Sequence, residues 1–192
     1  MKNVVTMVAL LVLVCSALSV AQTAGGWSVG VGAEGGVPIG DFSNVSSFGI
    51  GGTAWAGYNV DPSFLLAVKS GYLVFSVKDA LKPANVSASV KIIPIVLEGK
   101  YFFMPTGDTR VYGAADAGLY LLDIGASASV GGVSVSVSTT TSKFGFAPTL
   151  GAQFKVGDKM YVDAHGNYTY IATDGGSTSY IGFGLGLAFD LQ

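Results

Sequence analysis

His165 is the single histidine of the chain, and Asp163 lies two residues before it. In an extended strand the two side chains share one face, and a carboxylate beside an imidazole is an arrangement used in general-base catalysis. A serine would complete a hydrolytic site, but the next residue on that face is Asn167. One histidine, with a single cysteine at Cys15, is also a poor set of metal ligands. The pair therefore predicts a structural polar contact, and we expect no enzyme activity and no metal.

A second motif has the glycine spacing of a nucleotide-binding loop. Residues 30–35 read "GVGAEG", the spacing of a dinucleotide-binding loop. Such a loop must open a helix, whereas here Val37 and Pro38 follow. The context therefore fails, and no cofactor is expected.

Composition restricts the class of protein. Charged residues make up 11% of the chain, against about 25% in soluble domains. The net charge of −2 comes without a basic cluster, which excludes a nucleic-acid partner. A chain so poor in charge is either an apolar soluble β-protein or a β-barrel whose outer face meets lipid.

The N-terminus predicts export. Residues 1–21 combine a lysine, an apolar run and the ending Ser19-Val20-Ala21, the layout of a cleaved signal peptide. The run is too short for the roughly 20 residues of a transmembrane helix. Lipoprotein processing at Cys15 is disfavoured, because Val14 precedes it. Residues 22–192 are then one cysteine-free domain.

Period-two alternation of apolar and small residues recurs along this domain and predicts β-strands. The strands are expected at residues 27–38, 48–60, 64–77, 90–103, 110–124, 143–156, 160–171 and 180–191. Short turns at residues 59–63, 104–108 and 156–159 alternate with mostly longer loops, among them Asp174–Ser179. This alternation is typical of an eight-stranded antiparallel up-and-down transmembrane β-barrel. The last strand should then pair with the first.

Aromatic residues gather near both ends of the predicted strands. Two aromatic belts are what membrane interfaces select, although strands in general favour aromatics. The predicted belts consist of Trp27, Tyr58, Phe64, Tyr101, Phe103, Tyr112, Phe154, Tyr161 and Phe189 near the short turns, and Phe42, Phe48, Tyr72, Phe144, Phe146, Tyr168, Tyr170 and Tyr180 near the loops.

The longest loop, residues 125–142, contains Gly131-Gly132, a two-residue hairpin signal. Pairing Val130 with Val133 places valines and alanines on one face and serines on the other. We therefore expect a two-stranded ribbon above the membrane, with a flexible low-complexity loop as the alternative. Its open edges are suited to pairing with another chain.

The faces opposite the apolar rows carry mostly Gly, Ala, Ser and Thr, too sparse for a solvent face. As the lining of a narrow barrel they make sense, because eight strands leave room only for side chains. The polar residues on these faces are Glu34, Lys69, Glu98, Lys100, Asp116, Gln153, Lys155, Asp163, His165 and Asn167. We expect Glu34, Lys69, Glu98, Lys100, Asp116, Asp163 and His165 to form a lumen network, with Glu98 or Lys100 near His165.

Two prolines conflict with this pattern. Pro94 and Pro148 fall inside predicted strands, where each removes a ladder donor. They would need β-bulges or positions near the barrel rim.

The stretches "VGVGAEGGVPIGDF", "IIPIVLEGKYFF" and "YGAADAGLY", with the alternating last strand, resemble the small eight-stranded outer-membrane β-barrels, OmpX-like proteins and the OmpA transmembrane domain. The resemblance covers the domain and implies a bacterial outer-membrane location and assembly by the outer-membrane insertion machinery. The chain departs from the family by ending Phe189-Asp190-Leu191-Gln192 instead of in an aromatic residue.

The expected protein is a monomeric outer-membrane barrel with a plugged lumen, surrounded by phospholipid and lipopolysaccharide. Its role would be structural or adhesion-like, with an outside partner at residues 125–142. Two alternatives stay open: an outer-membrane enzyme that hydrolyses or acylates lipid A or phospholipid, and a soluble lipocalin-like periplasmic carrier.

Overall fold

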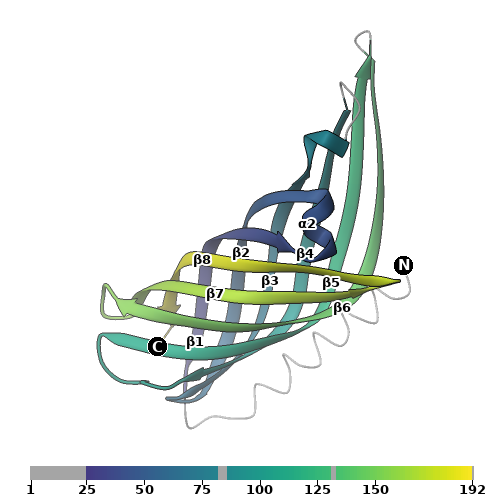
Figure 1. The fold of residues 1–192 in the computed structure, drawn as a ribbon. Helices are drawn as coiled ribbons and strands as arrows, with labels where there is room; N and C mark the ends of the chain where they lie inside the picture. The colour runs from purple at the N-terminus through teal and green to yellow at the C-terminus, as the bar shows by residue number, and fades with distance from the viewer. Residues whose placement is uncertain (1–24, 82–85, 131–132, 192) are drawn as a thin grey trace, which may run out of the picture.

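The fold is a closed barrel in which every strand is antiparallel to both neighbours and β8 returns to β1 (Figure 1). It was obtained as a computed structural model that describes residues 25–81, 86–130 and 133–191. The predicted signal peptide, residues 1–21, lies outside this range. The strands are β1 (Trp27–Ile39), β2 (Ser46–Asp61), β3 (Phe64–Val77), β4 (Val86–Phe102), β5 (Thr109–Val130), β6 (Val133–Lys155), β7 (Met160–Thr173) and β8 (Gly176–Asp190).

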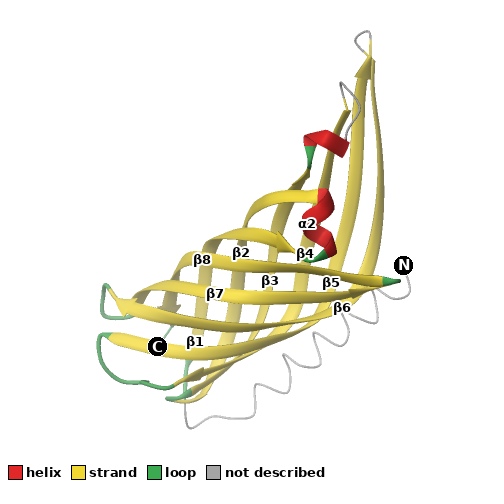
Figure 2. Ribbon diagram, in the orientation of Figure 1, coloured by secondary structure: helices red, strands yellow, loops and turns green. Residues whose placement is uncertain are grey.

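The two ends of the barrel differ as predicted. Tight connections join β2 to β3, β4 to β5 and β6 to β7 at one end, where the first and last described residues also lie. The other end carries a short helix, α2 (Asp41–Val45), and a 3-10 turn, η2 (Asp79–Leu81), neither of which was predicted (Figure 2). No helix among the described residues is long and apolar enough to cross a membrane.

Strand β8 explains how one sequence serves two environments. Its large residues point outward, and Leu185 is 65% exposed. Its glycines face inward, where a Cβ on Gly184 would lie 2.5 Å from the His165 ring and 3.0 Å from Glu34 Oε1. The bulk of the strand therefore meets lipid, and the missing side chains make room for the interior.

The hairpin predicted in the longest loop is confirmed, but it is not two-stranded along its whole length, because β4 pairs with β5 as far as Val86–Ala128. β5 and β6 pair without a register shift from Thr109–Phe154 to Val130–Val133. The hairpin rises far beyond the rest of the barrel (Figure 1). The loop predicted at Asp174–Ser179 is wrong in most of its length, because β8 begins at Gly176.

The bulges or rim positions predicted for Pro94 and Pro148 are wrong. Both prolines lie well inside their strands, and the register is the same on either side of each. The ladder instead skips the pairs at Pro94 with β3 and at Pro148 with β7. Each proline keeps its pair with β5, so it costs the barrel a donor on one side only. The Ser70 hydroxyl donates to the Pro94 carbonyl oxygen at 2.9 Å.

The belt prediction is correct for many aromatics and wrong for some. Outward residues such as Trp27, Phe103 and Phe144 are exposed near the strand ends. Four aromatics that were predicted to lie in the belts are instead inside the barrel: Phe42, Tyr112, Tyr161 and Tyr180. An aromatic ring suits a membrane interface and a packed interior equally, so its type does not decide its face.

We predict that Leu185→Arg lowers the free energy of unfolding by about 2–4 kcal/mol, because it places a charge on the lipid face near the middle of the membrane. Leu185→Phe, which keeps the face apolar, should leave the value within about 1 kcal/mol. Denaturant unfolding in liposomes measures both. Equal tolerance of Arg and Phe would contradict the orientation of β8.

Candidate functional site

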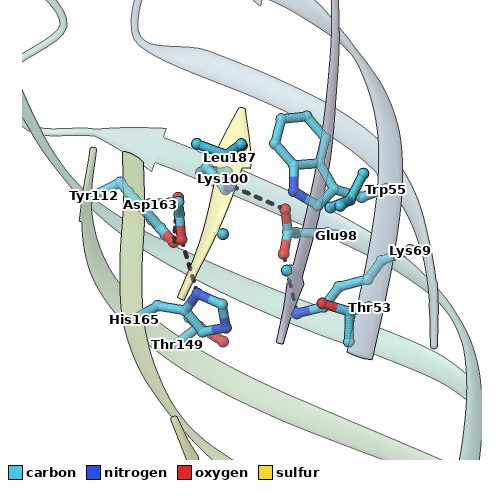
Figure 3. A pocket seen from close by; sticks show the side chains of 13 residues that line it. Thr53, Trp55, Lys69, Glu98, Lys100, Tyr112, Thr149, Asp163, His165 and Leu187 are labelled. Carbon is cyan, nitrogen blue, oxygen red and sulfur yellow. Dashed lines mark hydrogen bonds and ion pairs between the residues drawn. The ribbon is translucent and has the colours of Figure 1, made fainter. Parts of the chain in front are cut away.

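The barrel interior holds the predicted lumen residues. Glu34, Lys69, Glu98, Lys100, Asp116 and Asp163 are buried, and the His165 side chain is 12% exposed. Gln153 and Asn167 also point inward, whereas Lys155 is exposed at the end of β6. The interior contacts fall into two clusters that come from opposite walls (Figure 3).

The first cluster lies on β3, β4 and β5. Lys69 Nζ is 3.2 Å from Asp116 Oδ2 and 3.6 Å from Glu98 Oε2. Lys100 Nζ is 3.3 Å from the other Glu98 oxygen and sits over the rings of Trp55 and Tyr112. Glu98 therefore bridges two lysines, which would otherwise repel each other in a site without bulk water.

The second cluster centres on His165. Its Nδ1 lies 2.8 Å from Asp163 Oδ1 and its Nε2 lies 2.9 Å from Glu34 Oε1. A ring with a proton on each nitrogen donates to both carboxylates, and a ring with one proton donates to one of them. The contact with Asp163 was expected, and the second partner is Glu34 rather than Glu98 or Lys100.

Tyr112 joins the clusters. Its hydroxyl donates to Asp163 at 3.0 Å, while its ring receives Lys100. Arg110 extends the network toward the short-turn end through Gln153 at 2.8 Å and Asp190 at 3.4 Å. Sequence reasoning did not place Tyr112 or Arg110 in the lumen, although Tyr112 shares the inward phase of Asp116 and this phase was the available signal.

An apolar layer closes the loop end of the interior. Phe42 of α2 packs edge-on against Phe75 with ring centroids 5.1 Å apart, and Phe75 contacts Tyr180. Ile92, Leu122 and Ile171 belong to the same buried cluster. The polar network thus lies under an apolar cover, of which α2 is the outermost part.

Little space remains between these groups. Two interior cavities of about 20 Å³ each lie beside Lys69, one shared with Glu98 and His165 and the other with Asp116. Each has room for about one water molecule. Within the described residues, no group of three or more His, Cys, Asp or Glu is arranged to hold a metal ion. The interior is built as a packed ionic core.

The second candidate site is the β5–β6 ribbon. On one face Ile124 and Val137 are exposed, and on the other lie Ser127, Ser136 and Ser138. β6 pairs with β7 only up to Gly145, so among the described strands none covers the far edge of residues 133–144.

Pro148 identifies which residues present that edge. It keeps its pair with β5 and loses its pair with β7, so even-numbered residues of β6 direct their backbone groups toward the β7 side. The register stays constant up the ribbon. The free N–H and C=O groups therefore belong to Ser136, Ser138, Thr140 and Ser142.

Comparison with known proteins agrees with this geometry. Residues 7–189 match the model of the "Outer membrane protein beta-barrel domain" family. Among functionally curated proteins, no sequence matches the chain.

Three solved structures share the fold at low sequence identity. Neisserial surface protein A is 19% identical with a TM-score of 0.60, over 88% of this chain and 100% of that one. The Yersinia pestis attachment invasion locus protein Ail is 17% identical with a TM-score of 0.54, over 87% and 100%. A major outer membrane protein of Thermus thermophilus is 12% identical with a TM-score of 0.59, over 85% and 98%.

We predict that Glu98→Gln lowers the free energy of unfolding by about 3–5 kcal/mol, because it removes the charge that two buried lysines share. The matched control is Asp123→Asn, at a partly exposed pair with Lys91 whose charged atoms are 3.9 Å apart. That change should cost less than about 1 kcal/mol. Both are read by denaturant unfolding, and similar losses in the two variants would contradict the role of Glu98.

Proposed function

The chain belongs to the outer-membrane β-barrel domain family and lies in the outer membrane, and we propose that it is a sealed barrel that acts at the cell surface through its ribbon. A soluble carrier is excluded by this location. The observation that carries the proposal is the free edge of β6 between residues 133 and 144.

Three features support a sealed lumen. Hydrogen bonds from Tyr112 of β5 to Asp163 of β7 and from Arg110 of β5 to Asp190 of β8 cross the interior. The apolar cluster around Phe75 covers the polar network, and the two interior cavities measure about 20 Å³ each. An ion that crossed would have to displace this packing. The barrel then serves as an anchor for what rises above it.

Most of the free edge lacks the devices that keep strand edges from pairing. Between Ser134 and Ser142 the sequence "SVSVSTTTS" has no charged residue and no proline, and the ribbon has no bulge. Lys143 lies at the base of the edge, where it pairs with Asp174. Proteins usually protect such an edge with one of these features. An extended segment of another protein would gain backbone hydrogen bonds here by adding a strand.

The orientation supports a partner outside the cell. The ribbon rises at the end opposite the first and last described residues and the short turns, which is the outer end in barrels of this kind. One of the similar structures, Ail, is named an attachment invasion locus protein. Attachment to an external protein surface is the role we propose for this chain.

Catalysis has less support. His165 is enclosed by two carboxylates inside the barrel, and Leu185 and Leu187 occupy the neighbouring lipid face. A lipid substrate would have to pass the wall to reach it. We therefore propose a non-catalytic protein, assembled as a monomer by the outer-membrane insertion machinery.

The sealed lumen predicts no steady conductance when the purified chain is inserted into planar bilayers. The physical reason is that the interior holds room for single waters and no continuous aqueous path. Bilayers that received an equal amount of detergent serve as the control. A large, steady open level would contradict the seal.

The free edge predicts that Ser138→Pro strongly reduces attachment to a layer of cultured epithelial cells by bacteria displaying the chain. Proline removes one edge N–H and places its ring where an added strand would lie. Because residue 138 directs its backbone groups away from β5, the hairpin itself should persist.

Ser138→Val is the matched control, since it keeps the N–H and a strand-forming side chain. Display and folding of both variants are checked by surface labelling and by gel mobility before and after boiling. Equal attachment by wild type, Ser138→Pro and bacteria without the chain would refute the proposed function.

A further inference from the structure

The lipid-facing wall has a hollow on the β4–β7 side. It is a shallow, open depression with a volume of about 750 Å³. The floor consists of residues with little or no side chain: Gly99, Gly113, Ala115, Pro148 and Gly166.

The register shows how far this floor is continuous. Gly99 pairs with Ala115, and Ala115 pairs with Pro148, so three small residues lie side by side on adjacent strands. In the next row Gly113 pairs with Leu150, which pairs with Gly166. The continuous floor therefore runs across β4, β5 and β6, and the Leu150 side chain separates it from Gly166 on β7.

Large apolar side chains form the walls. Leu150 is 69% exposed and Phe103 is 59% exposed, with Tyr168 and Ile181 at the far side. Phe103 leans over β5, since a Cβ on Gly113 would lie 3.2 Å from its ring. No charged side chain lines the hollow. Its chemistry matches a flexible hydrocarbon chain.

The position of the hollow indicates the leaflet. On β4 the outward residues from Ile93 to Tyr101 are apolar or glycine, a stretch that spans roughly 20–25 Å across a membrane at a strand tilt of about 40°. Lys91 marks its outer limit. Gly99 and Phe103 lie near the opposite, short-turn end. From there the hollow runs obliquely along the wall past Pro148 to Tyr168 and Ile181, which lie nearer the loop end. Its end at Gly99 and Phe103 therefore opens to the periplasmic half of the bilayer.

We propose that this hollow holds one acyl chain of a phospholipid from the periplasmic leaflet and retains that lipid longer than the rest of the barrel surface does. Other outward faces carry exposed bulk, such as Val31 and Ile50, against which a chain makes contact from one side only. In the hollow, a chain contacts both floor and walls. This inference does not depend on the proposed role of the ribbon.

The test compares the full chain with Ala115→Phe, which fills the floor without altering a glycine. Proteins are extracted from outer membranes in mild detergent, washed, and analysed by native mass spectrometry and phosphorus content. Wild type should keep about one phospholipid per chain, and Ala115→Phe about tenfold less, the factor expected when roughly two buried methylene groups lose their contacts.

Ala54→Phe is the matched control, because Ala54 is an exposed outward residue of β2 paired with Val31. It should retain phospholipid like wild type. A second filling variant, Gly166→Leu, guards against misfolding of the first, since a Cβ there has only the Gly182 carbonyl oxygen nearby, at 3.8 Å. All variants are checked for heat-modifiable gel mobility.

Equal loss of phospholipid from wild type and both filling variants would overturn the proposal. Retention by folded Ala115→Phe and Gly166→Leu at the wild-type level would overturn it as well. If light scattering shows that the wild type is a dimer and that Ala115→Phe is a monomer, a second copy occupies the hollow and the acyl-chain assignment is wrong.

Discussion

The bilayer leaves a strand no water with which to pair its backbone groups, and this constraint governs the molecule. It requires a closed sheet, and closure divides every strand into an outward and an inward row. The outward row must be apolar. With eight strands the inward row surrounds a space hardly wider than its own side chains. Gly184 next to His165 and Glu34 illustrates the result, because the bulk that lipid allows outside has no room inside.

The interior of the barrel is filled largely by ion pairs and hydrogen bonds, where the core of a soluble protein would be filled by apolar side chains. Glu98, Asp163 and Glu34 each face a cation or its equivalent, so burial leaves few charges unpaired. Such a core adds little net stability compared with apolar packing, but it penalises every arrangement that separates the pairs. The strands above the membrane are free of these demands. There β4, β5 and β6 extend beyond the other strands, and β6 keeps an edge that no lipid-embedded strand can leave open.

Period-two alternation was sufficient to predict the strands and the phase of His165, and the Gly131-Gly132 hairpin signal was sufficient to predict the pairing of Val130 with Val133, because each depends on local sequence. It did not predict that Tyr112 and Tyr180 lie inside, since aromatic rings suit both faces. It also missed Phe42 in α2, whose burial depends on contacts with Phe75 from another strand. Nor did it resolve the prolines. Pro148 is accommodated by losing one ladder position, and the cost depends on which neighbour its nitrogen faces. The acyl-chain hollow arises from small residues on four strands, which only the register brings together.

The central claim is that alternate residues of one strand meet lipid and a packed interior. It is tested most directly on β4, where "IIPIVL" (Ile92–Leu97) is apolar throughout and composition does not reveal the face. The measurement is oxygen accessibility of nitroxide labels introduced singly in liposomes. High accessibility at Ile93, Ile95 and Leu97 with low accessibility at Ile92 and Val96 is the result we predict. Uniform accessibility along the segment, or the opposite phase, would contradict the account.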